Sequence, residues 1–411
     1  MSRRVVVTGL GAITPIGNDA RATWRAAVEG HSGVDFIRAF DPTGFPVRIA
    51  AEVKNFDPTS VASPKEIRKL DRNVLLALGA AKEAVGDAGL DADGYDPARV
   101  GIVFGSAIGG FLGIMEQHDV LRERGPDRVS PNFLQNVLVD SASGQLAISF
   151  GYRGPNYAPV SACATGSHAV GEGAELIKRG DADAVLAGGT EACIHPLILA
   201  GFTAMRGLVA EDEDPTRASR PFDATRAGFV MGEGACVLVL EELDAARARG
   251  STIYAEVLGY GTSNDAYHMV APDPESVGVC EMMRAALDRA GVAPERVGYI
   301  NAHGTSTPLG DAAETKAIKD IFGKHAYELA ASSTKSVMGH CFGAAGTIEA
   351  MMCVLAVREG VLPPTINYEN PDPECDLDYV PNEARKAEID VALSNAMGLG
   401  GHNACVLIGK I

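Results

Sequence analysis

One cysteine stands where a thiol could act as a nucleophile. Cys163 lies in segment 161–166, SACATG, whose residues are small and which joins an expected strand to an expected helix. The free N–H groups at a helix N-terminus favour a thiolate and can also bind an oxyanion, so this position is expected to lower the pKa of the cysteine. A buried structural cysteine would explain the same residues equally well.

Two histidines lie in polar segments that contain glycine. His303 is part of 301–311, NAHGTSTPLGD, and His340 is part of 332–346, SSTKSVMGHCFGAAG. These surroundings differ from those of a core histidine on an apolar helix face, and an imidazole can donate a hydrogen bond or move a proton. Alternatively, His303 is a turn or cap residue before the helix that Asp311 would begin.

Two further features accompany the cysteine and the histidines. Lys335 and Glu349 could form a buried charge pair near His340, although a solvated surface pair is the commoner arrangement for these residue types. Segment 398–403, GLGGHN, joins the last two expected strands. A backbone this rich in glycine suits close approach to a ligand and the supply of N–H donors, and a plain tight turn is an equally good explanation.

Other cofactor chemistries fit the residues poorly. Segment 9–14, GLGAIT, follows a strand but lacks the third small residue of a dinucleotide-binding loop, so we reject NAD binding. A zinc site formed by Cys163, His303 and His340 would lack paired ligand spacing, and the eight cysteines contain no C-x-x-C motif. The sequence therefore predicts a site without a metal or a cofactor.

Buried strands and helices must bring these segments together. Several of the expected strands are continuous apolar runs, which is typical of strands covered on both faces, and their alternation with helices predicts a layered α/β fold. The expected strands are 4–8, 100–104, 184–187, 235–240, 253–259, 297–301, 391–395 and 404–408. The expected helices are 20–28, 70–88, 166–178, 280–290, 312–321 and 346–357.

Internal similarity suggests a duplication. Segment 160–165 resembles 300–305, because each places a reactive side chain after alanine and two residues before threonine; segment 7–11 resembles 258–261. We predict two similar halves that deliver catalytic groups to a shared cleft. The predicted domains are 1–250, which carries Cys163, and 251–411, which carries His303 and His340.

Composition limits the class of protein. The chain has 411 residues and a formal net charge of −17, which argues against general nucleic-acid binding. It contains no apolar run near the ~18 residues needed to cross a membrane, and its first residues become polar too soon for a signal peptide. The scattered cysteines fit a reducing compartment, so we expect a cytoplasmic protein.

Taken together, these segments resemble the elongating β-ketoacyl-acyl-carrier-protein synthases, and the synthase II group among them most closely. The resemblance runs through the whole chain and includes 219–223, SRPFD, and 228–234, GFVMGEG. Segment 265–269, DAYHM, favours synthase II over synthase I. The resemblance implies the thiolase fold, with duplicated halves in a five-layer α-β-α-β-α arrangement, and a reaction without a cofactor.

The implied reaction is a decarboxylative condensation of acyl-ACP with malonyl-ACP (ACP, acyl carrier protein). It gives 3-oxoacyl-ACP and CO2 in fatty-acid elongation. Cys163 would carry the acyl group, and His303 and His340 would donate hydrogen bonds to the malonyl thioester oxygen. Backbone N–H groups of Cys163 and Leu399 would form the oxyanion hole. Lys335 and Glu349 would be the pair that supports the second histidine.

The resemblance also implies binding residues, a docking surface for ACP and a homodimer. The substrate-binding residues would be Ile108, Phe133 and Phe202 in an acyl tunnel, Thr305 and Thr307 beside the pantetheine amides, and Leu399. ACP would dock on Lys65, Arg68, Lys69, Arg72, Arg128 and Arg206, of which the first four have the spacing of one helix face. Some relatives hold a structural monovalent cation, for which Asn301, Glu349, Ser394 and Asn395 are suitably placed.

Two positions depart from the family pattern. Leu399 stands where the family usually has phenylalanine, which puts gating and chain-length preference in question. Val270 stands where a threonine is common beside the pantetheine channel. Three alternatives stay open: a type II polyketide or specialised-lipid ketosynthase, a non-catalytic chain-length scaffold, and a thiolase-type degradative enzyme that uses coenzyme A thioesters. The sequence does not give the preferred acyl chain length or unsaturation.

Overall fold

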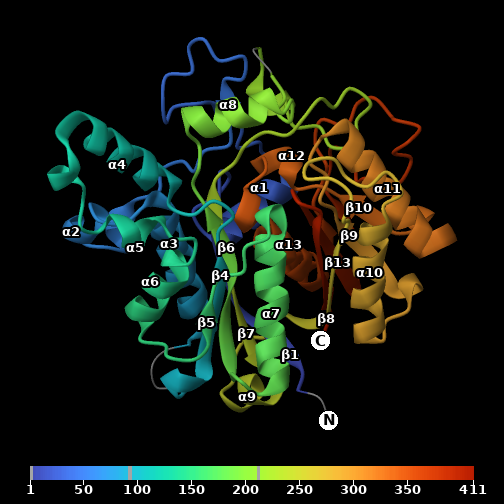
Figure 1. Ribbon diagram of the computed structural model, residues 1–411. Helices are drawn as coiled ribbons and strands as arrows, with labels where there is room; N and C mark the ends of the chain where they lie inside the picture. The colour runs from blue at the N-terminus through green and yellow to red at the C-terminus, as the bar shows by residue number, and fades with distance from the viewer. Residues whose placement is uncertain (1–2, 91–94, 211–212) are drawn as a thin grey trace.

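The structure, a computed structural model, describes residues 3–90, 95–210 and 213–411. Within these ranges the main sheet has ten strands in the order β10-β9-β13-β14-β8-β1-β7-β6-β4-β5 (Figure 1). Their bounds are β1 Val5–Ile13, β4 Val100–Gly105, β5 Asn156–Tyr157, β6 Ala184–Glu191, β7 Gly234–Glu242, β8 Ala255–Asn264, β9 Val297–Asn301, β10 Ala330–Ser332, β13 Val391–Gly398 and β14 His402–Gly409. Two short pairs lie outside it, β2 Asp35–Phe36 with β3 Ile49–Ala50 and β11 Val361–Leu362 with β12 Arg385–Lys386.

The sheet repeats one strand arrangement on either side of its middle. From the middle outward, one side reads β1-β7-β6-β4-β5 and the other reads β8-β14-β13-β9-β10. On both sides the first two pairings are antiparallel and the last two are parallel. Strands β1 and β8 meet through a short antiparallel register that joins the two sides. The exact residue at which a domain boundary falls, near 250, stays a prediction.

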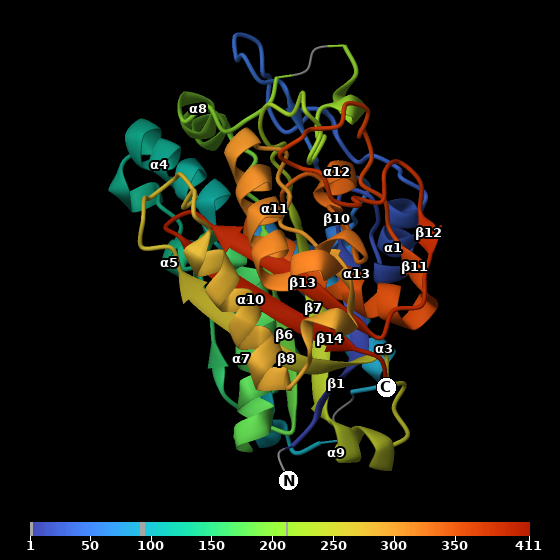
Figure 2. The same ribbon diagram turned by 90° about the vertical axis from the view of Figure 1, so that its right-hand side faces the viewer.

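Helices complete the layers on both faces of the sheet. Helix α3 (Arg72–Ala88) packs on β1 and β7, and α10 (Val277–Ala290) packs on β8 and β14. Between them lie α7 (Thr165–Arg179) and α13 (Ala345–Glu359), which contact each other and strands of both sides. Figures 1 and 2 show the order α-β-α-β-α, with α6 (Ser141–Phe150) beside α3 and α11 (Pro308–Phe322) beside α10. The thiolase-like α/β fold predicted from the sequence is therefore present.

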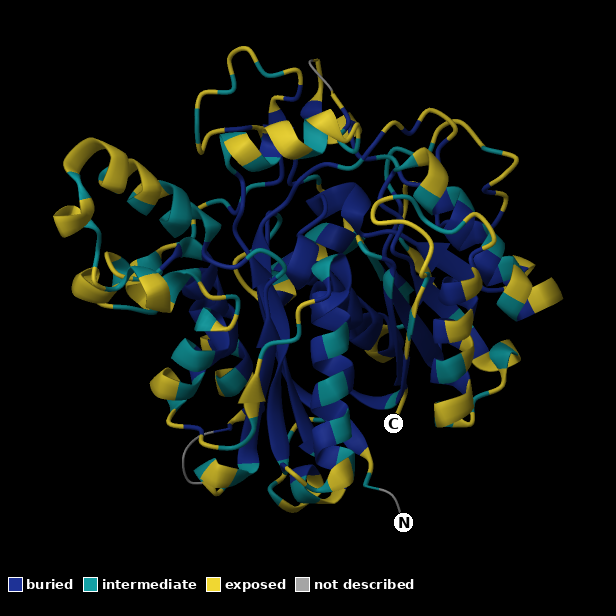
Figure 3. Cartoon of the chain, in the orientation of Figure 1, coloured by how far each residue is buried: buried dark blue, intermediate teal, exposed yellow. Residues whose placement is uncertain are grey.

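The remaining helices lie around this layered body. They are α1 Ala20–Val28, α2 Pro64–Ile67, α4 Phe111–Arg124, α5 Phe133–Val137, α8 Pro196–Ala204, α9 Leu243–Ala248 and α12 Lys335–Met338. Apart from the exposed edge strand β5, the strands of the sheet are mostly buried, as is helix α13, whereas α4 and α5 contain no buried residue (Figure 3). In the described part of the chain, no helix combines the length and the apolar character needed to cross a membrane.

The similarity of segments 7–11 and 258–261 reflects the duplication. A Cβ on Gly11 would lie 1.9 Å from the carbonyl oxygen of Ala80 on α3, and a Cβ on Gly261 would lie 1.9 Å from that of Met282 on α10. Glycine is needed at both positions because a helix backbone crosses the strand there. These glycines also carry β1 and β8 beyond the predicted ends of the strands.

The similarity of segments 160–165 and 300–305 does not reflect the duplication. Cys163 follows β5, whose counterpart in the other half is β10, whereas His303 follows β9, whose counterpart is β4. The counterpart of the Ala162–Ala164 3₁₀ turn before α7 is instead the Phe342–Ala344 3₁₀ turn before α13. The predicted catalytic residues Cys163 and His303 therefore come from non-equivalent positions of the two halves.

The predicted basic helix face is wrong, because two helices occupy this region. Helix α2 ends at Ile67, and the side chain of Asp71 caps a second helix that begins at Arg72. Arg72 forms an ion pair of 2.7 Å with the buried Glu233, while its own side chain is 38% exposed, so its part in docking stays a prediction. The other three residues of the set, Lys65, Arg68 and Lys69, are exposed.

Candidate active site

Cys163 lies in a tight turn that leads into α7. The preceding residue, Ala162, has a φ of +50°, which L-residues rarely adopt, and Cys163 is only 7% exposed. The end of β13 packs directly on this turn, since a Cβ on Gly398 would lie 2.6 Å from the carbonyl oxygen of Ser161. The backbone N–H of Leu399 is near enough to the Cys163 thiol to act on its pKa, in the direction that favours the thiolate.

Burial controls the protonation of this thiol. Loss of solvent raises the pKa of Cys163 to about 12, while the charge of Lys335 and the N–H of Leu399 act in the opposite direction. The lowered pKa expected from the helix N-terminus is therefore wrong. Cys163 is a neutral thiol at pH 7, and a reaction at its sulfur must remove its proton.

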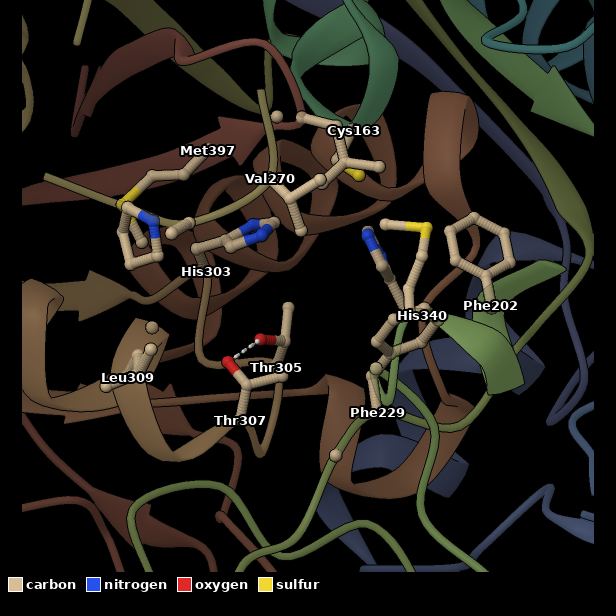
Figure 4. Close-up of a pocket in the computed structure, with 18 of the residues that line it drawn as sticks. Cys163, Phe202, Phe229, Val270, His303, Thr305, Thr307, Leu309, His340 and Met397 are labelled. Atoms are coloured by element: carbon tan, nitrogen blue, oxygen red, sulfur yellow. Dashed lines mark hydrogen bonds between the residues drawn. The ribbon is translucent and has the colours of Figure 1, made fainter. Parts of the chain in front are cut away.

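The two histidines lie near each other on the side of the cavity opposite Cys163 (Figure 4). His303 follows β9 and His340 follows α12, and their ring centroids are 5.4 Å apart at an angle of 88°. Burial lowers the pKa of both imidazoles well below the ordinary 6.5, and the charge of Lys335 lowers both further. Both rings are therefore neutral at pH 7 and each carries one N–H donor.

A buried carboxylate fixes the backbone around His303. The N–H groups of His303 and Gly304 each donate a hydrogen bond of 2.8 Å to Glu314, and the Asn395 amide donates a third of 3.1 Å. The sequence reasoning missed Glu314. The available signal was its spacing of three from Asp311, which places two acidic residues on the otherwise apolar, buried face of α11.

The 228–234 segment fixes the backbone of His340. The N–H of His340 donates to the carbonyl of Val230 at 2.8 Å, and the N–H of Gly232 donates to the carbonyl of His340 at 2.9 Å. The His340 ring packs against Phe229 and Phe342, with centroid distances of 5.6 and 5.0 Å. This short strand-like pairing explains why the glycine-rich motif is part of the site.

The charge pair predicted between Lys335 and Glu349 is present and buried. The two side chains form an ion pair, and each is only 2% exposed. Burial raises the pKa of Glu349 to about 7, although Lys335 opposes that change. The positive charge so held beside the histidines disfavours their protonation, which keeps them as neutral hydrogen-bond donors.

The cavity beside Cys163 has a volume of about 410 Å³. One side is aromatic, because Phe202 stacks on Phe342 at 5.3 Å and meets Phe229 edge-on at 5.3 Å. Another side is polar: the hydroxyl groups of Thr305 and Thr307 are 3.0 Å apart, as the dashed line in Figure 4 shows. A long apolar chain and a polar arm could thus meet at the thiol.

The structure gathers most, but not all, of the predicted residues at this cavity. Those that line it are Cys163, Phe202, Arg206, Val270, His303, Thr305, Thr307, His340 and Leu399. Ile108 packs in the same apolar cluster as Cys163 without lining the cavity. Phe133 lies on α5, far to the left of the site in Figure 1, and Arg128 is exposed between α4 and α5.

The four residues suggested for a monovalent cation, Asn301, Glu349, Ser394 and Asn395, are all buried. Asn301 on β9 and Ser394 on β13 are register partners, Asn395 follows Ser394, and α13, which carries Glu349, packs on both strands. One oxygen of each of these side chains has no hydrogen-bond partner among the described residues. Oxygen is the ligand type of a monovalent cation, but Ser394 and Asn395 are consecutive in β13 and point to opposite faces of the sheet, with the Asn395 amide bonded to Glu314 on α11, so a cation site stays a prediction. Within the described ranges, no group of three or more His, Cys, Asp or Glu residues is arranged to hold a metal ion.

Comparisons with known proteins agree with this geometry. Residues 2–246 match the family model "Beta-ketoacyl synthase, N-terminal domain", and residues 254–369 match "Beta-ketoacyl synthase, C-terminal domain". The chain is 50% identical over 409 residues to "3-oxoacyl-[acyl-carrier-protein] synthase 2" of Coxiella burnetii (strain RSA 493 / Nine Mile phase I), covering 100% of this chain and 99% of that protein. It is 49% identical over 409 residues, with the same coverage, to the protein of that name from Staphylococcus aureus strain N315.

A solved structure is similar over its full length. It contains a type II polyketide synthase acyl carrier protein in complex with its ketosynthase bound to the hexaketide. The TM-score is 0.92 at 33% sequence identity, and the match covers 100% of both chains.

Proposed function

This chain belongs to the beta-ketoacyl synthase family and is an ACP-dependent elongating ketosynthase of fatty-acid synthesis, and we propose that Cys163, His303 and His340 carry out its reaction. The observation that carries this assignment is the meeting of one buried thiol with two neutral imidazoles at a single cavity. The donors lie opposite the nucleophile, which is the arrangement needed to activate one thioester beside another.

In the first half of the reaction, the sulfur of Cys163 attacks the carbonyl carbon of acyl-ACP. A new C–S bond forms, the bond to the carrier arm breaks, and the proton of the Cys163 thiol ends on the departing arm sulfur. The backbone N–H groups of Cys163 and Leu399 hold the oxyanion of the tetrahedral intermediate. The close packing of Gly398 on the Cys163 turn, where a Cβ would lie 3.2 Å from the Cys163 nitrogen, supports this role.

In the second half, malonyl-ACP loses CO2 at the histidine pair. The electron pair of the broken C–C bond forms an enolate, whose oxygen accepts hydrogen bonds from His303 and His340. The enolate carbon then attacks the carbonyl carbon of the acyl group on Cys163. The C–S bond to Cys163 breaks, 3-oxoacyl-ACP leaves, and the Cys163 sulfur takes up a proton from solvent. Lys335 and Glu349 act as positioning residues, and a monovalent cation held by Asn301, Glu349, Ser394 and Asn395 would stabilise their buried charge.

Fatty-acid elongation fits this chain better than polyketide synthesis. The relatives named for 3-oxoacyl-ACP synthesis are 49–50% identical, whereas the polyketide ketosynthase is 33% identical. That structure pairs a ketosynthase with an acyl carrier protein, which supports ACP as the partner here. We place ACP docking on the exposed Lys65, Arg68, Lys69, Arg128 and Arg206. The buried free thiols support the cytoplasm as the compartment.

The exposed edge of the sheet supports the proposal of a homodimer. Strand β5 lies at the end of the sheet, and the apolar side chains near it include Leu134, Leu138 and Ile148, which are 69%, 55% and 77% exposed. Apolar groups gathered at a strand edge are typical of an association surface. We infer that a second copy covers this surface and that each copy contributes Phe133 to its partner's acyl tunnel.

Malonyl-ACP decarboxylation tests the histidine roles separately from condensation. We expect Cys163→Ala to release CO2 but to make no 3-oxoacyl-ACP. We expect His303→Ala and His340→Ala each to lose about 100-fold or more in CO2 release, the size expected for one oxyanion donor. His31→Ala is the control, since His31 is 70% exposed. Parent-rate CO2 release by either cavity variant would remove that histidine from the mechanism.

A further inference from the structure

Two walls of the cavity come from distant parts of the chain. One wall is segment 227–229, and another contains Thr305, Thr307 and the first residues of α11. Figure 4 shows Phe229 on the right of the cavity, with Thr305, Thr307 and Leu309 toward its lower left. The distance between these walls determines how closely a polar arm can approach the threonine hydroxyls on its way to Cys163.

Arg226 directly precedes the first wall and is bonded to the second. Its side chain is only 4% exposed. Nε donates to the carbonyl of Thr307 at 3.3 Å, and Nη2 donates to that of Pro308 at 2.9 Å. Nη1 donates to the carbonyl of Asp223 at 3.0 Å, within the turn that leads to the first wall. The planar fork of an arginine can reach these three oxygens at once, and a lysine ammonium cannot.

Two carboxylates hold the charge of Arg226 in place. Nη1 lies 2.5 Å from Asp372, and Nε lies 3.7 Å from Asp311, whose side chain is fully buried. The Arg226 guanidinium lies beside the N-terminus of α11, where a positive charge is unfavourable because the helix dipole is positive at that end. The negative charges of Asp372 and Asp311 compensate for this repulsion. Because its partners come from three segments, at 223, at 307–311 and at 372, the guanidinium has one well-defined position.

Ser306 makes a second connection between the walls. It lies between the two threonines with a φ of +70°, a backbone conformation that requires support from the surrounding structure. Its carbonyl accepts from the N–H of Gly228 at 2.9 Å, and its hydroxyl accepts from the N–H of Arg220 at 3.1 Å. The motifs 219–223 and 228–234 thus lie on either side of Arg226 and hold the threonine segment from both directions.

We propose that Arg226 is a positioning residue for the pantetheine arm of the substrates. It does not touch the arm; it holds the carbonyls of Thr307 and Pro308 so that the hydroxyls of Thr305 and Thr307 face the arm amides at a fixed distance from segment 227–229. This inference rests on the proposed function. It adds that one buried guanidinium fixes the position of the residues that bind the pantetheine arm and does not take part in the chemistry at Cys163.

Arg226→Lys tests the proposal because it keeps the charge and removes the fork. The substrate is malonyl-pantetheine, which carries the arm without a carrier protein. We expect a rise of about ten-fold in KM for its decarboxylation with kcat within about three-fold of the parent. The rate of Cys163 alkylation by iodoacetamide should stay unchanged. Arg217→Lys is the matched control: it lies on the same chain segment, is 50% exposed and pairs with the exposed Glu369.

The outcomes separate this inference from the proposed function. An inactive parent enzyme would overturn the function itself. An unchanged KM in Arg226→Lys, or equal losses in kcat and in the alkylation rate, would overturn the positioning role. If Arg226→Lys does not fold, Asp372→Asn removes one partner of the guanidinium and should raise the same KM by about three-fold at unchanged kcat. An Asp372→Asn enzyme with the parent KM would then count against the proposal.

Discussion

At the scale of single residues, opposing effects act on the Cys163 thiol. The helix N-terminus, the N–H of Leu399 and the charge of Lys335 all favour the thiolate, while burial disfavours it and raises the pKa to about 12. The enzyme therefore keeps a protonated thiol until a substrate arrives. In the proposed reaction, acylation then depends on the oxyanion donors and on the departing carrier arm, which takes up the proton.

This account predicts the pH dependence of Cys163 alkylation. Because the pKa lies far above neutrality, the thiolate fraction and the rate with iodoacetamide should rise about ten-fold per pH unit from pH 7 to pH 9. The measurement is the pseudo-first-order rate of carbamidomethylation at Cys163, with Cys163→Ala as the blank. A plateau below pH 8 would mean that the dipole and the charges outweigh burial.

The nucleophilic and hydrogen-bonding residues of the candidate site could be predicted from the sequence, whereas the contacts that hold them in place could not. Cys163, His303 and His340 stand out by residue type and by their small or glycine-containing neighbours. Glu314 and Arg226 do not, because an acid on a helix and an arginine in a loop usually face solvent. Their roles depend on burial, which only the packed structure reveals.

At the scale of elements, a close helix crossing brings the catalytic turns together. A Cβ on Gly166 of α7 would lie 2.6 Å from the backbone nitrogen of Thr347, and a Cβ on Gly346 of α13 would lie 2.6 Å from that of Ser167. Each helix therefore uses a glycine in its first turn against the other helix. The crossing sets the position of Cys163 relative to the segment that carries His340.

Gly166→Ala should separate the two helices. We expect it to lower the free energy of unfolding by about 1–3 kcal/mol, as overpacking does, and to slow condensation. Gly86→Ala is the control, because a Cβ there meets nothing within 4 Å and should raise stability by about 0.4–1 kcal/mol. Urea unfolding measures both. Equal stability of the two variants would contradict the role assigned to the crossing.

Element types were predictable, while their ends and some pairings were not. The apolar runs indicated the buried strands, and α1 and β9 have the predicted ends. The helix predicted at 70–88 is present as α3, but the prediction that Lys65, Arg68, Lys69 and Arg72 share one helix face failed. Their spacing matches one helix, whereas Ser63 and Asp71 cap two separate helices. The similarity of 160–165 to 300–305 failed because it compares residues that follow non-equivalent strands.

At the scale of the whole molecule, the negative net charge of this chain would repel a carrier protein that is itself acidic and so would oppose their association. The chain has a net charge of −17, so any attraction must come from a local basic surface. Lys65, Arg68 and Lys69 are exposed on and just after α2 and form such a surface. Attraction of this kind weakens at high salt.

Reversal of charge at Lys65 and Lys69 tests this docking surface. We expect Lys65→Glu/Lys69→Glu to raise KM for malonyl-ACP and to leave KM for malonyl-pantetheine unchanged. The exposed pair Lys324 and Lys410 provides a control with the same change of net charge, Lys324→Glu/Lys410→Glu. Steady-state kinetics at low and high salt gives both constants. The proposed docking surface is contradicted if Lys65→Glu/Lys69→Glu changes KM for malonyl-ACP and KM for malonyl-pantetheine by the same factor.

The exposed apolar side chains near the edge strand β5 predict that the protein forms a homodimer. Leu138→Asp/Ile148→Asp places two charges where we expect a second copy, so light scattering should report a monomer in place of a dimer. Val277→Asp, at a position that is 55% exposed on α10, should stay dimeric. A parent protein that is itself monomeric would overturn the homodimer and with it the shared role of Phe133.

The measurement that tests the central claim most directly is the mass of the intact enzyme during one turnover. The enzyme is mixed with acyl-ACP of graded chain length and then with malonyl-ACP, with Cys163→Ala alongside. We predict one acyl group on Cys163, which disappears as a 3-oxoacyl-ACP two carbons longer forms, and the series also ranks the chain lengths that Leu399 admits. No acyl adduct, or the same adduct in Cys163→Ala, would contradict the account.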